Sequence, residues 1–454
     1  MNIENLKKNI LIVWQISWPL IIANSFWNFQ VTIDRMFLGQ YSTESLAAAI
    51  AAVGFFWGPM ALVQQTAAYV TTFVAQYTGA KKPDRIGPSV WHSVYVSMIG
   101  GGLFLLLIPA SHTIFGWMGH SEKIMDLEIQ YFSALAFSAL PTALVAAISG
   151  FYTGIGRSRP IMIINGTGLV FNVLFDYLII FGNFGFPELG IYGAGIATAM
   201  ANALGATVGF IMLFKQYGAA NFNLVKGWRP EKDLMYRYFR FGVPSGMQWA
   251  LEGLAFTFFL ALLGRLPNGD SALAASGITV TIMMLAILPV LGVAQGVASL
   301  VGQNLGENNE EGAVQVTWAG VSMTIMYMIV MGSSFLMFPE FYMGFFAGSA
   351  NPELWNEVAQ MVPYLLMFVT VFIVFDGLNL IFSFTLKGAG DTHFVSMVAL
   401  LLPWPIMVLP SWYVSDWNNG VYWAWAAASL FISLQGLIFL LRFLQGRWKK
   451  MRVI

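Results

Sequence analysis

This sequence has few charged residues: lysine, arginine, aspartate and glutamate make up 10% of its 454 residues, against about 25% in soluble proteins. It has no cysteine, which excludes disulfides and thiolate metal sites. Its net charge is zero, so nothing indicates a nucleic-acid partner. No two of the four histidines have the i, i+4 spacing of metal ligands: His92, His112, His120 and His393. A chain with 57% hydrophobic residues cannot cover itself with a water-facing surface, so its solvent is the bilayer.

Apolar runs long enough to cross a bilayer, about 20 residues each, follow one another along the chain. The first run is too long for a signal peptide and has no small-residue cleavage site, so we interpret it as a membrane helix. We predict an all-α integral membrane protein with no soluble domain. Its twelve transmembrane helices are expected at residues 10–38, 46–78, 89–117, 125–153, 159–183, 191–215, 235–264, 272–304, 312–342, 355–386, 392–414 and 420–444.

The basic residues favour one orientation. All but three of the 22 lysines and arginines, including Lys387 after the tenth helix, lie on one side of the predicted helices. The exceptions are Arg35, Lys123 and Arg265. The positive-inside rule therefore predicts that both termini are cytoplasmic, which an even number of helices allows. We expect a multi-pass protein of the cell (inner) membrane.

The two halves of the chain repeat a pattern. Gly39 follows Pro19 by twenty residues, and Gly264 follows Pro244 by the same distance. Three further pairs match in order: Leu46-Ala47-Ala48-Ala49 with Leu273-Ala274-Ala275-Ser276, Val74-Ala75-Gln76 and Gly79 with Val301-Gly302-Gln303 and Gly306, and Gly154-Ile155-Gly156 with Gly388-Ala389-Gly390. Small residues also recur in membrane helices for close packing, but ordered matches favour a repeat. We predict two six-helix lobes, 1–220 and 221–454, related by a pseudo-two-fold axis along the membrane normal.

Four carboxylates fall inside the predicted helices: Asp34, Asp176, Glu252 and Asp376. Each costs about 2.5–3.5 kcal/mol at membrane depth, and the four together on the order of 10 kcal/mol, so we expect them to be functional. No basic residue lies in mid-helix beside them. We therefore expect bound protons, metal cations or a cationic substrate to neutralise them. Alternatives remain, because Asp34 could form a surface pair with Arg35 and the other three could make purely structural polar contacts.

Amide and hydroxyl side chains accompany two of these acids. Asn172 precedes Asp176 by four residues, which places both on one helix face. An amide carbonyl and a carboxylate are oxygen ligands that suit a hard cation such as sodium. Asp376 is followed on its helix by Asn379 and Ser383, which extend a polar stripe.

These features and several motifs resemble the multidrug and toxic compound extrusion (MATE) family over nearly the whole chain. The motifs are Trp18-Pro19 with Asp34 before Gly39, Ala75-Gln76-Tyr77-Thr78-Gly79-Ala80, Asn172-Val173-Leu174-Phe175-Asp176, Gly193-Ala194-Gly195-Ile196-Ala197-Thr198, Pro244-Ser245-Gly246 with Glu252, and Asp376 with Lys387-Gly388-Ala389-Gly390-Asp391. The resemblance implies export of organic cations and drugs, driven by inward flow of sodium ions or protons.

The resemblance also implies the site residues. In members with a cation site in the N-terminal lobe, the ligands match Asp34, Asn172, Asp176, the Ala194 carbonyl and Thr198, so Na⁺ is a possible occupant. In other members, acids that match Glu252 and Asp376 in the C-terminal lobe serve in coupling or substrate binding. An aromatic hydroxyl often found four residues before the second of these acids is Phe372 here. We therefore expect the N-terminal set to be the better cation site.

We expect a secondary active antiporter that exports organic cations in exchange for Na⁺ or H⁺ by alternating access. We expect no cofactor and no enzymatic activity. Three alternatives fit the sequence less well. A lipid-linked oligosaccharide flippase of the same superfamily would need cavity arginines for pyrophosphate, a membrane-embedded enzyme would need a catalytic cluster, and a channel would need a continuous pore. The sequence indicates none of these. The expected partners are the lipid bilayer and organic cations, and we expect a monomer.

Overall fold

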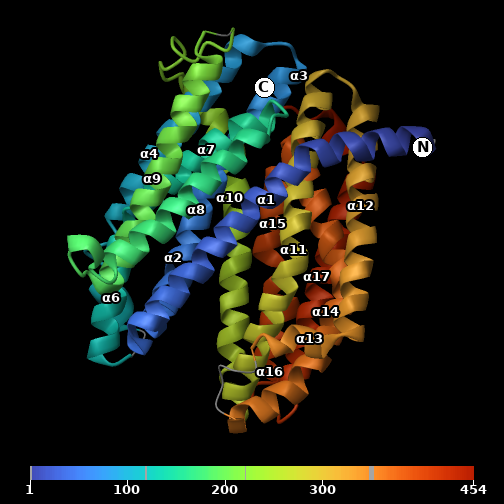
Figure 1. Ribbon diagram of the computed structural model, residues 1–454. Helices are drawn as coiled ribbons and strands as arrows, with labels where there is room; N and C mark the ends of the chain where they lie inside the picture. The colour runs from blue at the N-terminus through green and yellow to red at the C-terminus, as the bar shows by residue number, and fades with distance from the viewer. Residues whose placement is uncertain (1–2, 118–119, 220, 347–351) are drawn as a thin grey trace. The chain divides into compact units, whose positions relative to one another are not determined.

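The computed structural model describes residues 3–117, 120–219, 221–346 and 352–454, and within them the chain forms helices and no strand (Figure 1). Ten helical spans are long and apolar enough to cross a membrane. An eleventh forms if α6 (Glu122–Ala136) and α7 (Ala139–Gly154), bent by 41° at their junction, cross together. The prediction of an all-α membrane protein is confirmed.

The third predicted span, residues 89–117, is the one that this set leaves out, and it begins in α4 (Ile86–Leu105). This helix carries buried serines and the buried His92 among its apolar residues. The buried groups find partners on neighbouring backbone, as when the Ser93 hydroxyl donates to the Ala67 carbonyl at 2.7 Å. Polar residues bonded in this way are tolerated at membrane depth, so α4 completes the predicted set.

The helices fall into two compact units, which are described separately. The first, called the N-unit, comprises Trp18–Ala250 with Gly302–Asn309 and Arg452–Ile454. Besides α4, α6 and α7 it contains α2 (Thr43–Ala68), α3 (Val70–Gly79), η1 (Pro83–Arg85), α5 (Ser111–Gly116), α8 (Arg159–Ile179), η2 (Asn183–Gly185) and α9 (Gly190–Tyr217). Phe132 of α6 lies in its apolar core, where the rings of Phe55, Phe56, Phe104 and Phe115 have centroids 5.7–6.4 Å from its own.

The second unit, called the C-unit, comprises the described residues up to Ser17, Leu251–Val301 and Glu310–Met451. Its helices include α12 (Glu310–Met337), α13 (Pro339–Gly344), α14 (Pro352–Ala389), α15 (Thr392–Leu401), the π-helical turn η3 (Trp404–Val408), α16 (Leu409–Tyr413), α17 (Gly420–Leu444) and η4 (Arg447–Lys450). Helix α14 packs against both α12 and α17. The buried Trp425 of α17 donates from Nε1 to Ser276 Oγ at 2.9 Å.

Three helices contribute residues to both units: α1 (Ile3–Tyr41), α10 (Lys232–Leu263) and α11 (Gly269–Gly306). Each remains helical through an internal proline, namely Pro19, Pro244 and Pro289. A proline removes one backbone hydrogen bond, and membrane helices tolerate this loss when neighbouring groups satisfy the freed carbonyl. The predicted lobe boundary at residue 220 stays a prediction.

Two repeated glycines make reciprocal contacts within the N-unit. A Cβ added at Gly79 would collide with the backbone of Gln303, and one added at Gly306 would collide with the backbone of Gln76. Gln76 and Gly79 are the sequence counterparts of Gln303 and Gly306. The repeat therefore returns as a symmetric backbone contact, as expected for a pseudo-two-fold axis.

A second pair of repeat counterparts makes equivalent contacts, each inside its own unit. A Cβ at Gly154 would lie 2.9 Å from the Thr71 carbonyl oxygen, and one at Gly388 would lie 2.6 Å from that of Ala298. Both distances are too short for a real side chain. Glycine at these places thus allows two helices to approach backbone to backbone in both copies.

Candidate functional site

Five predicted site residues come together in the N-unit from three helices: Asp34 of α1, Asn172 and Asp176 of α8, and Ala194 and Thr198 of α9. The Thr198 hydroxyl donates to the Ala194 carbonyl at 3.0 Å and lies 3.5 Å from Asp34 Oδ2. The Asn172 Nδ2 atom lies 3.4 Å from Thr198 Oγ1. Asn172 and Asp176 are fully buried, and Asp34 is 7% exposed.

Local helix geometry places these groups. Asn172 and Asp176 are one turn apart on α8, and Ala194 and Thr198 are one turn apart on α9, so each pair shares a helix face. The two helices pack closely because Gly193 leaves room for the α8 backbone. A Cβ there would lie 2.9 Å from the Ile179 carbonyl oxygen.

The site holds more oxygen acceptors than donors. Asp34 Oδ1, Asn172 Oδ1 and both Asp176 carboxylate oxygens are buried without a hydrogen-bond donor. The two carboxyl groups also interact directly with each other. Two carboxylates can hydrogen-bond only through a shared proton, so the site fits either a proton or a hard cation with oxygen ligands.

Two further residues interact electrostatically with this acid pair. Arg35, the next residue on α1, interacts with Asp34 but has an exposed side chain. Tyr131 of α6 is buried and interacts with both Asp34 and Asp176. Sequence reasoning missed Tyr131, because its proximity depends on how α6 packs against the other helices.

The predicted acid Glu252 has a different environment in the C-unit. The buried Gln435 of α17 donates from Nε2 to Glu252 Oε1 at 2.5 Å. Lys387 in the last turn of α14 interacts electrostatically with Glu252. The lysine is 4% exposed, and its Nζ lies 3.9 Å from the centroid of the Phe384 ring.

This lysine corrects one step of the sequence reasoning. The sequence places Lys387 just after a tenth helix that is predicted to end at residue 386, and it shows no basic residue in mid-helix beside Glu252. The helix continues to Ala389, so Lys387 lies in its last turn, where packing buries the side chain and lets it interact with Glu252. Lys387 and Gln435 are distant from Glu252 in the chain, and no local spacing signals them.

The predicted acid Asp376 is buried in α14 at 8% exposure. Asn379 donates from Nδ2 to Asp376 Oδ1 at 3.3 Å, which confirms the first part of the predicted polar stripe. The Ser383 hydroxyl instead donates to the Leu380 carbonyl at 3.1 Å. Phe372, one turn before the acid, is a fully buried core residue.

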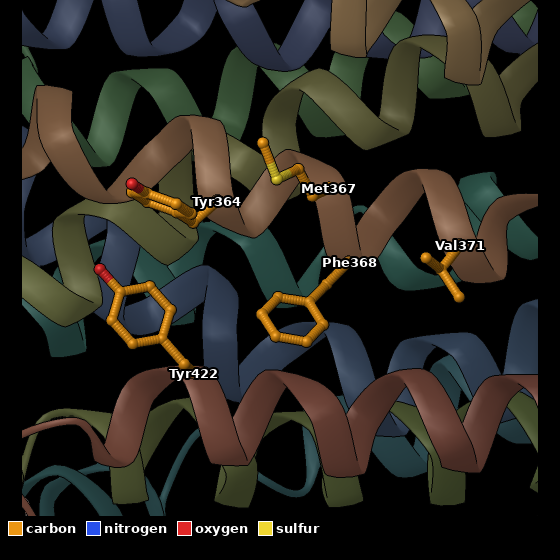
Figure 2. Close-up of a pocket in the computed structure, with 5 residues that line it drawn as sticks. All are labelled: Tyr364, Met367, Phe368, Val371 and Tyr422. Atoms are coloured by element: carbon orange, nitrogen blue, oxygen red, sulfur yellow. The ribbon is translucent and has the colours of Figure 1, made fainter.

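The C-unit also contains an open pocket of about 600 Å³ between α14 and α17. Its lining residues are all uncharged: Tyr364, Met367, Phe368, Val371 and Tyr422. Figure 2 shows Phe368 and Tyr422 pointing into the space between the two helices. The rings of Tyr364 and Tyr422 meet edge to face, with centroids 5.9 Å apart. Aromatic faces and a flexible thioether suit flat apolar molecules.

Within the described residues, no group of three or more histidine, cysteine, aspartate or glutamate side chains could hold a metal ion. A repeated all-helical membrane fold with buried, separate acid sites defines an integral-membrane transporter rather than an enzyme. The chain belongs to the MatE family, whose sequence model matches residues 19–178 and 244–412.

Relatives support this assignment along most of the chain. Probable multidrug resistance proteins NorM of Thermotoga maritima and Rhizobium meliloti are 24% and 28% identical to it. The first alignment covers 93% of this chain and 89% of the relative, and the second covers 84% and 81%. An outward-facing multidrug resistance MATE family transporter of the MOP superfamily has the same fold, with a TM-score of 0.87 at 19% identity over 97% of both chains. The predicted twelve-helix fold is thereby confirmed, and the protein acts on small molecules in a lipid bilayer.

Proposed function

We propose that this protein is a secondary antiporter that exports organic cations and drugs in exchange for Na⁺ or H⁺. The observation that carries the proposal is the pair Asp34 and Asp176. Both acids are buried, they interact directly, and their oxygens outnumber the available donors. Such a pair is stable when a cation or proton is present between the carboxylates, so occupancy by the ion changes the energy of the site.

The names of the relatives support the substrate class. The NorM relatives are described as probable multidrug resistance proteins. The uncharged aromatic pocket of the C-unit offers this chain a place for the apolar part of a drug, and aromatic faces also attract organic cations. We assign the pocket to substrate and the Asp34–Asp176 pair to the coupling ion.

The coupling follows from differential binding. An external ion that binds Asp34 and Asp176 neutralises charge at the meeting point of α1, α8 and α9, and it favours the conformation in which these helices close around it. Substrate is released outside as the ion binds, and the ion is released inside. The ion drives the cycle only as far as its affinities for the two conformations differ. We also propose that both termini are cytoplasmic, that the protein lies in the inner membrane and that it is a monomer.

The test uses purified protein in proteoliposomes, an imposed sodium or proton gradient, and ethidium as a fluorescent organic cation. We expect one of the two gradients to drive ethidium movement in the wild type. Asp34→Asn should abolish the gradient dependence. Asp270→Asn, at an exposed acid in the first turn of α11, is the matched control and should behave as wild type.

Two results would contradict the proposal. If neither gradient moves ethidium in the wild type, this substrate class is excluded. Normal coupling in Asp34→Asn, together with loss of coupling in Glu252→Gln, would move the coupling site to the C-unit.

A further inference from the structure

The segment between α9 and α10, residues 221–230, lies against one face of α4 in the N-unit. Trp91 of α4 donates from Nε1 to the Leu224 carbonyl at 2.7 Å. The Tyr95 hydroxyl, one turn further along α4, donates to the Trp228 carbonyl. At about 1.5 Å per residue, Tyr95 lies roughly 14 Å from the start of α4. The segment therefore follows the first turns of a membrane helix and does not extend away from it.

The face of α4 that this segment covers continues as an exposed apolar stripe. Past Tyr95, large exposed side chains recur at helical spacing: Met98, Ile99, Leu103 and Leu106. Phe214, exposed near the end of α9, has its ring centroid 6.4 Å from that of Trp91. Exposed apolar faces of spanning helices contact lipid. Because α9 and α10 both cross the membrane, the segment lies at the membrane surface, beside this lipid-facing stripe.

Internal contacts fix the shape of the segment. The Gly227 N–H donates to the Asn223 carbonyl at 2.8 Å and closes a turn. The Phe222 ring packs on that of Tyr217, with centroids 5.4 Å apart. Four exposed side chains combine apolar and basic character: Val225, Lys226, Trp228 and Arg229. Val225 is 61% exposed and Trp228 is 52% exposed, and exposed apolar groups on a fixed surface indicate an interaction site.

The acids beside the segment are bound to other residues. Glu231 pairs with Arg85 of η1 at 2.7 Å. Asp233 pairs at 2.7 Å with an arginine one turn further along α10. Among the described residues, no ion pair involves Lys226 or Arg229. The segment therefore presents two positive charges at the membrane surface, and nearby carboxylates do not neutralise them.

We propose that residues 221–230 form a lipid-binding surface for anionic phospholipid. Val225 and Trp228 enter the boundary between headgroups and acyl chains, and Lys226 and Arg229 bind the lipid phosphate. This inference does not depend on which ion or drug the protein transports. In the proposed orientation, the surface faces the cytoplasmic leaflet, whose anionic lipids attract basic segments.

The residue types suit the two layers that they would meet. Tryptophan favours the membrane–water interface because its ring is apolar while its N–H is polar. Lysine and arginine near an anionic membrane surface each strengthen binding about fivefold. The hydrogen bonds to Trp91 and Tyr95 hold the segment in place before lipid binds, so little ordering opposes the contact.

The first experiment uses the absence of cysteine from the chain. Val225→Cys accepts a single environment-sensitive NBD label, and the protein is placed in lipid nanodiscs, in which both membrane faces are open to solution. The label should emit at shorter wavelength than in water and should be shielded from a water-soluble quencher. Asp84→Cys, at an exposed residue of η1 beside the start of α4, carries the same label as the matched control and should stay open to the quencher.

The second experiment measures headgroup preference. Nitroxide-labelled phosphatidylglycerol or phosphatidylcholine is added to the nanodiscs, and quenching of the label at position 225 gives the relative affinity of the two lipids. Phosphatidylglycerol should be preferred at least about fivefold, the contribution of one basic residue. Lys226→Gln with Arg229→Gln should abolish the preference. Lys81→Gln with Lys82→Gln, two exposed lysines in the turn before η1, is the matched control and should keep it.

Trp228→Ala separates the apolar contact from the charged one. It should reduce shielding of the label in nanodiscs of either lipid while the preference for phosphatidylglycerol remains.

Three results would overturn the lipid surface. The first is a label at position 225 that is as open to the quencher as the label at position 84. The second is equal affinity for the two lipids in the wild type. The third is an unchanged preference after both Lys226 and Arg229 are replaced. None of these measurements involves an ion gradient, so each outcome leaves the proposed antiport to its own test.

Discussion

The N-unit and the C-unit each bury acids, but they balance them differently. Asp34 and Asp176 interact directly, and Asp34 Oδ1 and both Asp176 carboxylate oxygens lack a donor. Glu252 instead receives a hydrogen bond from Gln435 and interacts with the buried lysine Lys387. The comparison shows that one unit leaves its acids without a basic partner, whereas the other places a lysine within reach of its acid.

The two acid sites are not two copies of one repeated site. The offset of 225 residues that relates Pro19 to Pro244 pairs Asp34 with Phe259 and Glu252 with Trp27. The backbone repeat therefore survives where the acids do not correspond. The two acid sites therefore lie at different places in the repeat and can serve different roles.

The largest expected effect tests whether the N-unit is the coupling site. Asp176→Asn should reduce gradient-driven ethidium transport on the order of a hundredfold, at the upper end of known coupling free energies, because an amide cannot exchange charge with an ion. Glu252→Gln should reduce it far less. Initial rates of the two variants in the same vesicles give the ratio, and a larger loss in Glu252→Gln would reverse the comparison.

The next effect tests the internal cation of the C-unit. Lys387→Met should destabilise the protein by about 1–2 kcal/mol, since it removes the cationic neighbour of Glu252, which is only partly buried and keeps its hydrogen bond from Gln435. The double variant Lys387→Met with Glu252→Gln should recover most of that loss. Thermal unfolding in detergent measures both. Lys123→Met, which breaks an exposed pair, is the control and should cost less than about 1 kcal/mol. Additive effects in the double variant would show that the two charges do not interact.

Much of the fold could be predicted because its signals are local. Apolar run lengths gave the spans, and the last one, 420–444, coincides with α17. One-turn spacing on α8 and α9 correctly placed Asn172 beside Asp176 and Ala194 beside Thr198. These pairs need only helix geometry, which the sequence determines directly.

The rest depends on contacts between distant segments. Gln435 and Glu252 are 183 residues apart, and no periodicity links them. Lys387 was missed because a lysine beside a glycine-rich turn has the pattern of a solvated helix end. Glu128 of α6 is fully buried and lies inside the predicted span 125–153, so an acid within an apolar run was a signal that could have been used. Its hydrogen-bond partner His120 lies outside that span, so the contact could not have been found this way.

A moderate effect tests whether the two copies of the repeat depend equally on their contact glycines. Gly79→Ala and Gly306→Ala should each destabilise the protein by about 1–3 kcal/mol, because the added methyl group meets backbone that cannot move aside. Gly54→Ala, which has open space around it, should have little effect. Melting temperatures of the three variants decide the point. A large effect at only one of the two contact glycines would show that the two copies do not contribute equally to stability.

The smallest expected effect concerns the hydroxyl at the edge of the N-unit site. Thr198→Val should weaken ion binding by about 1 kcal/mol, the value of a typical hydrogen bond, or roughly fivefold in affinity. The ion concentration at half-maximal ethidium transport measures it. Thr207→Val, which changes an exposed threonine on the same helix, is the control. Equal affinities in the two variants would remove Thr198 from the ion site.

The reciprocal contact of Gly79 with Gln303 and of Gly306 with Gln76 has a consequence for how such a chain can evolve. In a dimer of identical halves, this is an isologous interface, in which one substitution strikes both sides at once. Once both halves belong to one gene, each glycine can be kept while the surrounding residues change separately. A duplicated protein can in this way preserve a symmetric backbone contact and still place a pair of acids in one half and a lysine beside an acid in the other.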